Sequence, residues 1–205
     1  NVPKEQFAHY DSISGNALLN DRGIHLANND IGPKGPGRDW TLAEGAPLVE
    51  NLTGRDFGQG RAMFKASLCS SCHSIGGEGG SVGPDLTQLG TRFSGKDILE
   101  SIIEPSKAIS DQYAATNFLL KDGSTVMGRL IRDDNDKYYV SQNPFAPQTL
   151  REIPKKDVAS TKLSDVSIML PGLINRLNPE ELKDLMAYLM SGGDKNNKVF
   201  KGGDK

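Results

Sequence analysis

The sequence lacks long apolar runs, an excess of either charge, and all but two cysteines. No apolar stretch approaches the roughly 18 residues that a membrane-spanning helix requires, so we expect no membrane span. The 24 Lys and Arg residues nearly balance the 26 Asp and Glu residues, for a net charge of -2 at pH 7. This balance argues against a broad electrostatic surface for nucleic acid or anionic lipid. Two cysteines three positions apart exclude a disulfide framework.

The N-terminal region lacks a periodic apolar pattern and a basic-then-apolar leader. We therefore expect a mature or trimmed form from which an export signal is gone. Residues 1–50 are rich in helix breakers, and Gly32-Pro33-Lys34-Gly35-Pro36-Gly37 cannot form a helix. We interpret residues 1–50 as an extension that wraps around the following domain, with Trp40 packing it onto the core.

Three later segments have the apolar spacing of helices. The first runs from Arg55 into the cysteine pair and ends near His73. Ser94 is placed to cap the second, which Pro105 ends. Asn178, with Pro179 next to it and Glu181 three positions on, predicts the start of the third.

The apolar period changes from near 3.6 to 2 between the second and third of these helices. Five short β-prone runs, separated by turn signals such as Asp122-Gly123, predict a small antiparallel β unit over residues 113–163. The runs are Tyr113 to Leu120, Thr125 to Ile131, Lys137 to Gln142, Leu150 to Ile153 and Val158 to Leu163. Residues 192–205 are rich in Gly, Lys, Asp and Asn, and we expect a flexible tail.

The two cysteines belong to Cys69-Ser70-Ser71-Cys72-His73, the C-x-x-C-H attachment sequence of c-type haem. On a helical turn these side chains share one side, so that two thiols reach the haem vinyl groups and an imidazole reaches the iron. A thioredoxin-like pair fits less well, because a helix precedes the motif and a glycine-rich loop follows it. A zinc site needs two more ligands, and His9 and His25 do not stand at the required spacing.

The second axial position decides between electron transfer and ligand chemistry. Met169 lies in a non-periodic loop before the last helix, from which a thioether can project inward. Its alternative is a loop methionine that fills a gap. We expect His9 and His25 to be ordinary surface or loop histidines, although His25 is the rival ligand. The other methionines fall on helical faces or in the β unit, where core filling is common: Met63, Met186, Met190 and Met127.

In this order the motifs resemble a class I c-type cytochrome, and more closely the planctomycete-type haem-binding domain family. The likeness covers roughly residues 40 to 191. It is carried by Gly54-Arg55-Asp56, residues 69 to 73, Val82-Gly83-Pro84-Asp85-Leu86-Thr87, Arg92-Phe93-Ser94, Glu104-Pro105-Ser106-Lys107, Ser110-Asp111-Gln112-Tyr113 and the Met169 loop.

The resemblance implies a mainly α cytochrome c fold with an inserted small antiparallel β unit, α+β overall. The cytochrome c domain would span residues 51–191, with 113–163 as the insertion. The resemblance also implies one covalent haem c with His73 and Met169 as iron ligands. Pro84 would offer its carbonyl to the His73 imidazole, and Arg92 would face a haem propionate. The plainer alternatives are a simple turn at Pro84 and a solvated surface arginine.

These features predict a one-electron carrier, or an electron-transfer domain of a larger oxidoreductase system, and not an enzyme. The family resemblance implies a periplasmic or otherwise exported location and redox partner proteins, with a sugar or alcohol dehydrogenase as a plausible donor. Two alternatives remain. The first is a haem enzyme or gas-binding sensor with a displaceable sixth ligand, and the second is a carbohydrate- or protein-binding module built on the β unit.

Overall fold

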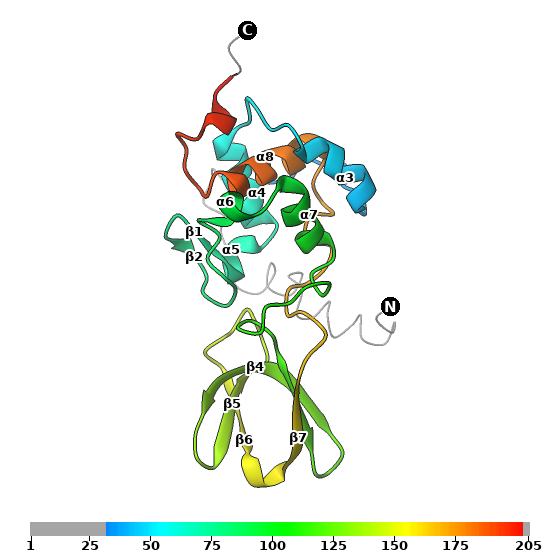
Figure 1. The fold of residues 1–205 in the computed structure, drawn as a ribbon, viewed down its shortest axis with the longest axis vertical. Helices are drawn as coiled ribbons and strands as arrows, with labels where there is room; N and C mark the ends of the chain where they lie inside the picture. The colour runs from blue at the N-terminus through cyan, green and yellow to red at the C-terminus, as the bar shows by residue number, and fades with distance from the viewer. Residues whose placement is uncertain (1–31, 203–205) are drawn as a thin grey trace. The chain divides into compact units, whose positions relative to one another are not determined.

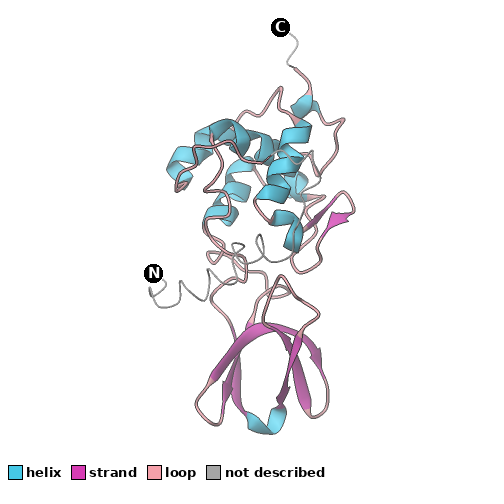
Figure 2. Cartoon of the chain, turned by 180° about the vertical axis from the view of Figure 1, so that it is seen from behind, coloured by secondary structure: helices cyan, strands magenta, loops and turns pink. Residues whose placement is uncertain are grey.

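The computed structural model describes residues 32–202, in which helices precede and follow an antiparallel sheet (Figures 1 and 2). His9, His25 and most of the predicted N-terminal extension lie outside the described residues. None of the helices among residues 32–202 combines the length and apolar character of a membrane span. The helices are α3 (Leu42–Val49), α4 (Phe57–Ala66), α5 (Cys69–Cys72), α6 (Leu89–Arg92), α7 (Gly95–Ile103) and α8 (Pro179–Met190).

The main core forms around α4 and α8. As predicted, Asn178 caps α8, and its side chain accepts hydrogen bonds from the backbone N–H groups of Glu180 and Glu181, both at 3.0 Å. Helix α8 is buried over most of its length. Its fully buried side chains pack with those of α4 and α7, and the largest of them are Met63, Leu99, Leu182, Leu185 and Met186. Full burial of these apolar side chains is the main stabilising contribution to the helical part.

Gly60 lets α4 and α8 cross closely. A Cβ atom at this position would lie 2.3 Å from the carbonyl oxygen of Asp184 and 2.8 Å from Cβ of Tyr188. Both neighbours are backbone or near-backbone atoms of α8, which cannot swing away. Any side chain at residue 60 therefore forces the two helices apart.

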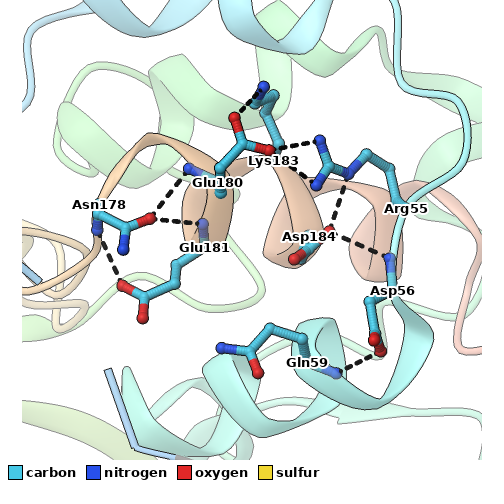
Figure 3. Close-up of polar contacts among 8 residues, drawn as sticks. All are labelled: Arg55, Asp56, Gln59, Asn178, Glu180, Glu181, Lys183 and Asp184. Carbon is cyan, nitrogen blue, oxygen red and sulfur yellow. Dashed lines mark hydrogen bonds and ion pairs between the residues drawn. The ribbon is translucent and has the colours of Figure 1, made fainter. Parts of the chain in front are cut away.

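An ion pair ties the start of α4 to α8 (Figure 3). Nε of Arg55 lies 2.8 Å from Oδ1 of Asp184, and the backbone N–H of Asp56 donates to the same oxygen at 3.1 Å. The Arg55 guanidinium also reaches Glu180 at 3.0 Å. The Asp184 side chain is only 8% exposed, so the arginine and the backbone donor compensate for the burial of its charge.

The structure differs from the sequence-based predictions at two places in this part of the helical region. The predicted helix from Arg55 to Cys72 is broken at Leu68, whose φ of 60° is left-handed and incompatible with a continuous helix. Residues 42–49, inside the predicted extension, form α3, which a Thr41–Glu44 capping box starts. Trp40 packs on the core as expected, and its indole N–H donates to the Leu177 carbonyl at 3.1 Å.

The end of the chain also differs from the predicted flexible tail. Val199 is buried at 9% exposure, and the Phe200 ring lies edge-on to Phe57, with 5.3 Å between the ring centroids. The backbone N–H groups of Gly54 and Arg55 donate to the carbonyls of Lys201 and Val199. These contacts order the chain after α8, because they place apolar side chains on the core and give the backbone hydrogen-bond partners. The polar composition of the segment did not indicate them.

The five β-prone runs form one antiparallel sheet, as predicted, with strand order β6-β5-β4-β3-β7. Gly123, with φ of 87°, makes the turn between β3 and β4 that Asp122-Gly123 indicated. The sheet has its own small core of Phe118, Val126, Val140 and Ile153. Its strands are β3 (Thr116–Leu120), β4 (Thr125–Asp133), β5 (Lys137–Ser141), β6 (Leu150–Pro154) and β7 (Val158–Leu163).

Gly60→Val tests the close helix crossing. We expect the free energy of unfolding to fall by about 2–3 kcal/mol, because the new side chain must displace the α8 backbone. Urea denaturation followed by circular dichroism measures the change. Gly58→Ala is the matched control on the exposed side of α4, and it should shift the free energy of unfolding by less than about 1 kcal/mol. Equal effects of the two substitutions would contradict the crossing geometry.

Phe118→Ala tests the sheet as a folded unit. Phe118 is fully buried in a four-residue core, so its truncation should cost about 3–5 kcal/mol and expose residues 113–163 to limited proteolysis. Leu119→Ala, on the same strand but 42% exposed, should leave the cleavage pattern unchanged. Rapid cleavage throughout the sheet of the unsubstituted protein would show that it is not a packed unit.

Candidate functional site

The attachment motif occupies the one-turn helix α5, which the left-handed residue Leu68 sets off from α4. The backbone N–H of His73 donates to the Cys69 carbonyl at 2.9 Å, which closes the turn. His73 itself is extended, so its side chain leaves the helix at the end of the motif. Cys69 and Cys72 are partly buried free thiols, and no disulfide joins them. The motif therefore presents two thiols and an imidazole within one turn and the residue after it.

The loop after the short strand β2 (Glu78–Gly79) holds the His73 imidazole in one orientation. Nδ1 of His73 lies 2.9 Å from the Pro84 carbonyl oxygen. Because a carbonyl can only accept, Nδ1 carries the proton and the lone pair of the neutral ring is on Nε2. Nε2 is thus the ring nitrogen available to bind a metal.

Gly83 packs against the face of the same ring. A Cβ atom at Gly83 would lie 2.5 Å from Cε1 and 2.7 Å from Nδ1 of His73, so no other residue fits without moving the imidazole. The Gly83 N–H donates to the Cys72 carbonyl at 2.7 Å. Gly83 therefore has two functions. Its N–H connects the loop to the attachment motif, and its lack of a Cβ leaves space for the His73 ring.

A second set of hydrogen bonds anchors the loop beyond Pro84. Asp85 accepts from the Ser74 hydroxyl at 2.6 Å and from the Thr87 backbone N–H at 2.8 Å, and these bonds lower the pKa of the Asp85 carboxyl. Thr87 Oγ1 accepts from the Gly76 N–H at 2.9 Å. The segment after His73 and the segment after Pro84 thus brace each other, which keeps the Pro84 carbonyl in place.

The protonation of the motif argues against a redox-active cysteine pair. Burial raises the pKa of the Cys69 thiol to about 12 and also raises that of Cys72. A redox-active pair needs a thiolate of lowered pKa. Burial lowers the pKa of His73, opposed in part by the bond to Pro84, so the imidazole is neutral at pH 7. Within residues 32–202, no group of three or more His, Cys, Asp or Glu side chains is arranged to hold a metal ion.

Met169 is partly buried and packs against the same core cluster as Cys69. Its backbone N–H donates to the Ser167 hydroxyl at 3.1 Å, which shapes the loop locally. Met63 and Met186 are fully buried among the core helices, and Met190 is partly buried at the end of α8. Met127 is 40% exposed on β4. Of the five methionines, Met169 combines a loop position with packing against the core.

Arg92 is the last residue of α6 and is exposed. In the described part of the chain its guanidinium has neither an ion pair with a carboxylate nor a side-chain hydrogen bond. The structure therefore leaves Arg92 available to a ligand without placing it against the His73 group.

One contact to this site has no local signal in the sequence. Arg129 of β4 donates to the carbonyl of Val82, next to Gly83, from 47 positions away along the chain. An isolated arginine in a β-prone run carries no motif, and only the folded sheet brings it to the loop. A second motif of the resemblance, Gly54-Arg55-Asp56, has a structural role instead. Arg55 and Asp56 hold the start of α4 against Asp184 of α8.

The residues present fit a covalently attached haem. Two free thiols stand at the attachment spacing, an imidazole presents Nε2, and a glycine leaves space against the ring. A cofactor of this kind needs the two thiols and the imidazole on one segment, with an outer partner to orient the imidazole.

A comparison with curated proteins found no match for the chain. The cytochrome c family model matches residues 58–193, well over half of the sequence, and the match begins in α4 and continues through α8. The match includes the attachment motif, the Pro84 loop and Met169. The chain therefore belongs to the cytochrome c family, whose members bind haem c covalently and carry electrons.

Proposed function

We propose that the protein is a one-electron carrier in which His73 and Met169 are the axial ligands of a single haem c. The observation that supports this most is the pair of contacts to the imidazole, the hydrogen bond between Nδ1 and the Pro84 carbonyl and the close approach of Gly83 to the ring. When bound, haem c supplies an iron that accepts and returns one electron. Cys69 and Cys72 attach it, and His73 presents Nε2 in a fixed orientation.

The Pro84 carbonyl makes the imidazole a stronger electron donor. A hydrogen bond from Nδ1–H shifts electron density onto the ring and raises the basicity of Nε2. The short loop from Gly83 to Thr87 holds this acceptor rigidly through its bonds to Ser74 and Gly76. The same rigidity suits electron transfer, because a ligand that stays in place needs little rearrangement when the charge of the iron changes.

Met169 is the proposed second ligand, since its thioether comes from a loop and packs against the same core cluster as Cys69. Thioether ligation raises the reduction potential of a haem iron relative to histidine. Arg92 is the proposed partner of a haem propionate, because an unpaired guanidinium fork matches a carboxylate. Both roles, for Met169 and for Arg92, are those that the family resemblance implies.

We further propose a place in the planctomycete-type haem-binding domain family and a periplasmic or otherwise exported location. Domains of the cytochrome c family are typically exported. The partners would be redox proteins, with a sugar or alcohol dehydrogenase as electron donor. The nearly balanced charge of the chain favours docking through a local surface over broad electrostatic attraction.

Cys69→Ser and Cys72→Ser test covalent attachment. In the unsubstituted holoprotein the intact mass should exceed that of the chain by one haem, and acid-acetone should leave the haem with the protein. Each single serine variant should retain one thioether bond, with a corresponding red shift of the reduced pyridine haemochrome band. Haem that passes into the organic layer from the unsubstituted protein would contradict the assignment.

Met169→Ala tests the second ligand. Loss of the thioether should abolish the weak far-red sulfur-to-iron band of the ferric protein, lower the reduction potential and admit added ligands such as cyanide or imidazole. Met127→Ala, on an exposed strand position, is the matched control and should leave the spectrum unchanged. An intact spectrum in Met169→Ala, with a high-spin spectrum in His25→Ala, would identify two histidine ligands instead. A ferric iron that is already high-spin in the unsubstituted protein would favour the ligand-binding alternative.

A further inference from the structure

The peptide group between Val82 and Gly83 is held at both ends. Its N–H, on Gly83, donates to the Cys72 carbonyl at 2.7 Å. Its carbonyl, on Val82, accepts from the Arg129 guanidinium. The two residues that follow this peptide both contact His73. Gly83 packs against the imidazole, and the Pro84 carbonyl lies on Nδ1. This peptide therefore helps to position both imidazole contacts, from the side of the loop opposite to the Ser74–Asp85 and Gly76–Thr87 bonds in the sequence.

Arg129 is well placed to fix that peptide. It is partly buried on β4, and its guanidinium carbon lies 5.3 Å from the centroid of the Tyr113 ring. Among the described carboxylates, none forms an ion pair with Arg129, so its charge is directed at the Val82 carbonyl. Val82 itself is buried at 8% exposure. A charge-assisted hydrogen bond is about twice as strong as a neutral one. Its strength is greater in the protein interior than in contact with water.

We propose that Arg129 is a positioning residue for the haem ligand: by holding the Val82–Gly83 peptide it keeps the Pro84 carbonyl on His73, and the inserted sheet thereby helps to set the reduction potential. The inference rests on the proposed function, in that it takes His73 to be an axial ligand. The proposal gives the sheet a function that the attachment motif alone does not indicate. In this proposal the sheet acts through one backbone peptide.

The sign of the change in potential separates this role from a simple charge effect. Removal of a positive charge near an iron favours the ferric state and lowers the reduction potential. Loosening of the Nδ1–H bond to Pro84 makes the imidazole a weaker donor, which disfavours the ferric state and raises the potential. Loss of Arg129 brings both effects, whereas loss of a charge elsewhere on the strand brings only the first.

The test compares Arg129→Gln with Arg132→Gln in the holoprotein. Arg132 is on the same strand, 56% exposed and paired with Asp134 at 3.1 Å, so its substitution removes the same charge without touching the loop. The first measurement is solvent exchange of the His73 Nδ1 proton, followed by NMR in the diamagnetic reduced protein. Arg129→Gln should speed exchange about fivefold to tenfold, the factor that corresponds to one hydrogen bond of ordinary net strength. Arg132→Gln should leave the rate unchanged.

The second measurement is the reduction potential: a value in Arg129→Gln above that of the unsubstituted protein supports the proposal, because loss of the positive charge alone lowers the potential. Equal exchange rates and equal potentials in the two variants would overturn the proposal. If Arg129→Gln does not yield folded holoprotein, Arg129→Met replaces it. Methionine keeps an unbranched apolar stem but cannot donate a hydrogen bond, so exchange should still be faster than in the unsubstituted protein, and an unchanged rate would overturn the proposal. An unsubstituted holoprotein without a ligated His73 would instead contradict the proposed function.

Discussion

The hydrogen bond from Nδ1 of His73 to the Pro84 carbonyl is the constraint on which the site depends. It fixes the tautomer of the ring and directs Nε2 away from the loop. Most other local features follow from the need to keep that carbonyl in place. Gly83 is required because the ring occupies the space of its Cβ, and the Ser74–Asp85 and Gly76–Thr87 bonds brace the two segments that meet there. The left-handed residue Leu68 turns the chain from α4 into the attachment motif.

The helical core supplies the platform for this loop. The close crossing of α4 and α8 at Gly60 and the buried Arg55–Asp184 pair fix the helix that precedes the motif against the helix that follows Met169. The two segments that carry the proposed iron ligands are thus joined through α4 and α8, although nearly a hundred positions separate them in the sequence. The sheet between them has a separate small core and reaches the site through Arg129.

Local signals in the sequence predicted much of this arrangement. Ser94 and Asn178 marked helix starts, Asp122-Gly123 marked a hairpin, and the strands formed where the apolar period is 2. The attachment motif was recognisable because its chemistry requires a fixed spacing within one turn. Helix α3 was missed because its pattern is short and contains Pro47. The break at Leu68 was missed because nothing in a leucine indicates a left-handed backbone. The contact of Arg129 with Val82 depends on tertiary structure alone, and no local pattern could reveal it.

The absorption spectrum of the oxidised and reduced holoprotein tests the central claim, a single covalent haem with histidine and methionine ligands, most directly. We expect a low-spin spectrum in both states, a sharp α band of c-type haem on reduction, and a weak far-red band in the ferric protein from sulfur bound to iron. A high-spin ferric spectrum, or a low-spin spectrum without the far-red band, would contradict it.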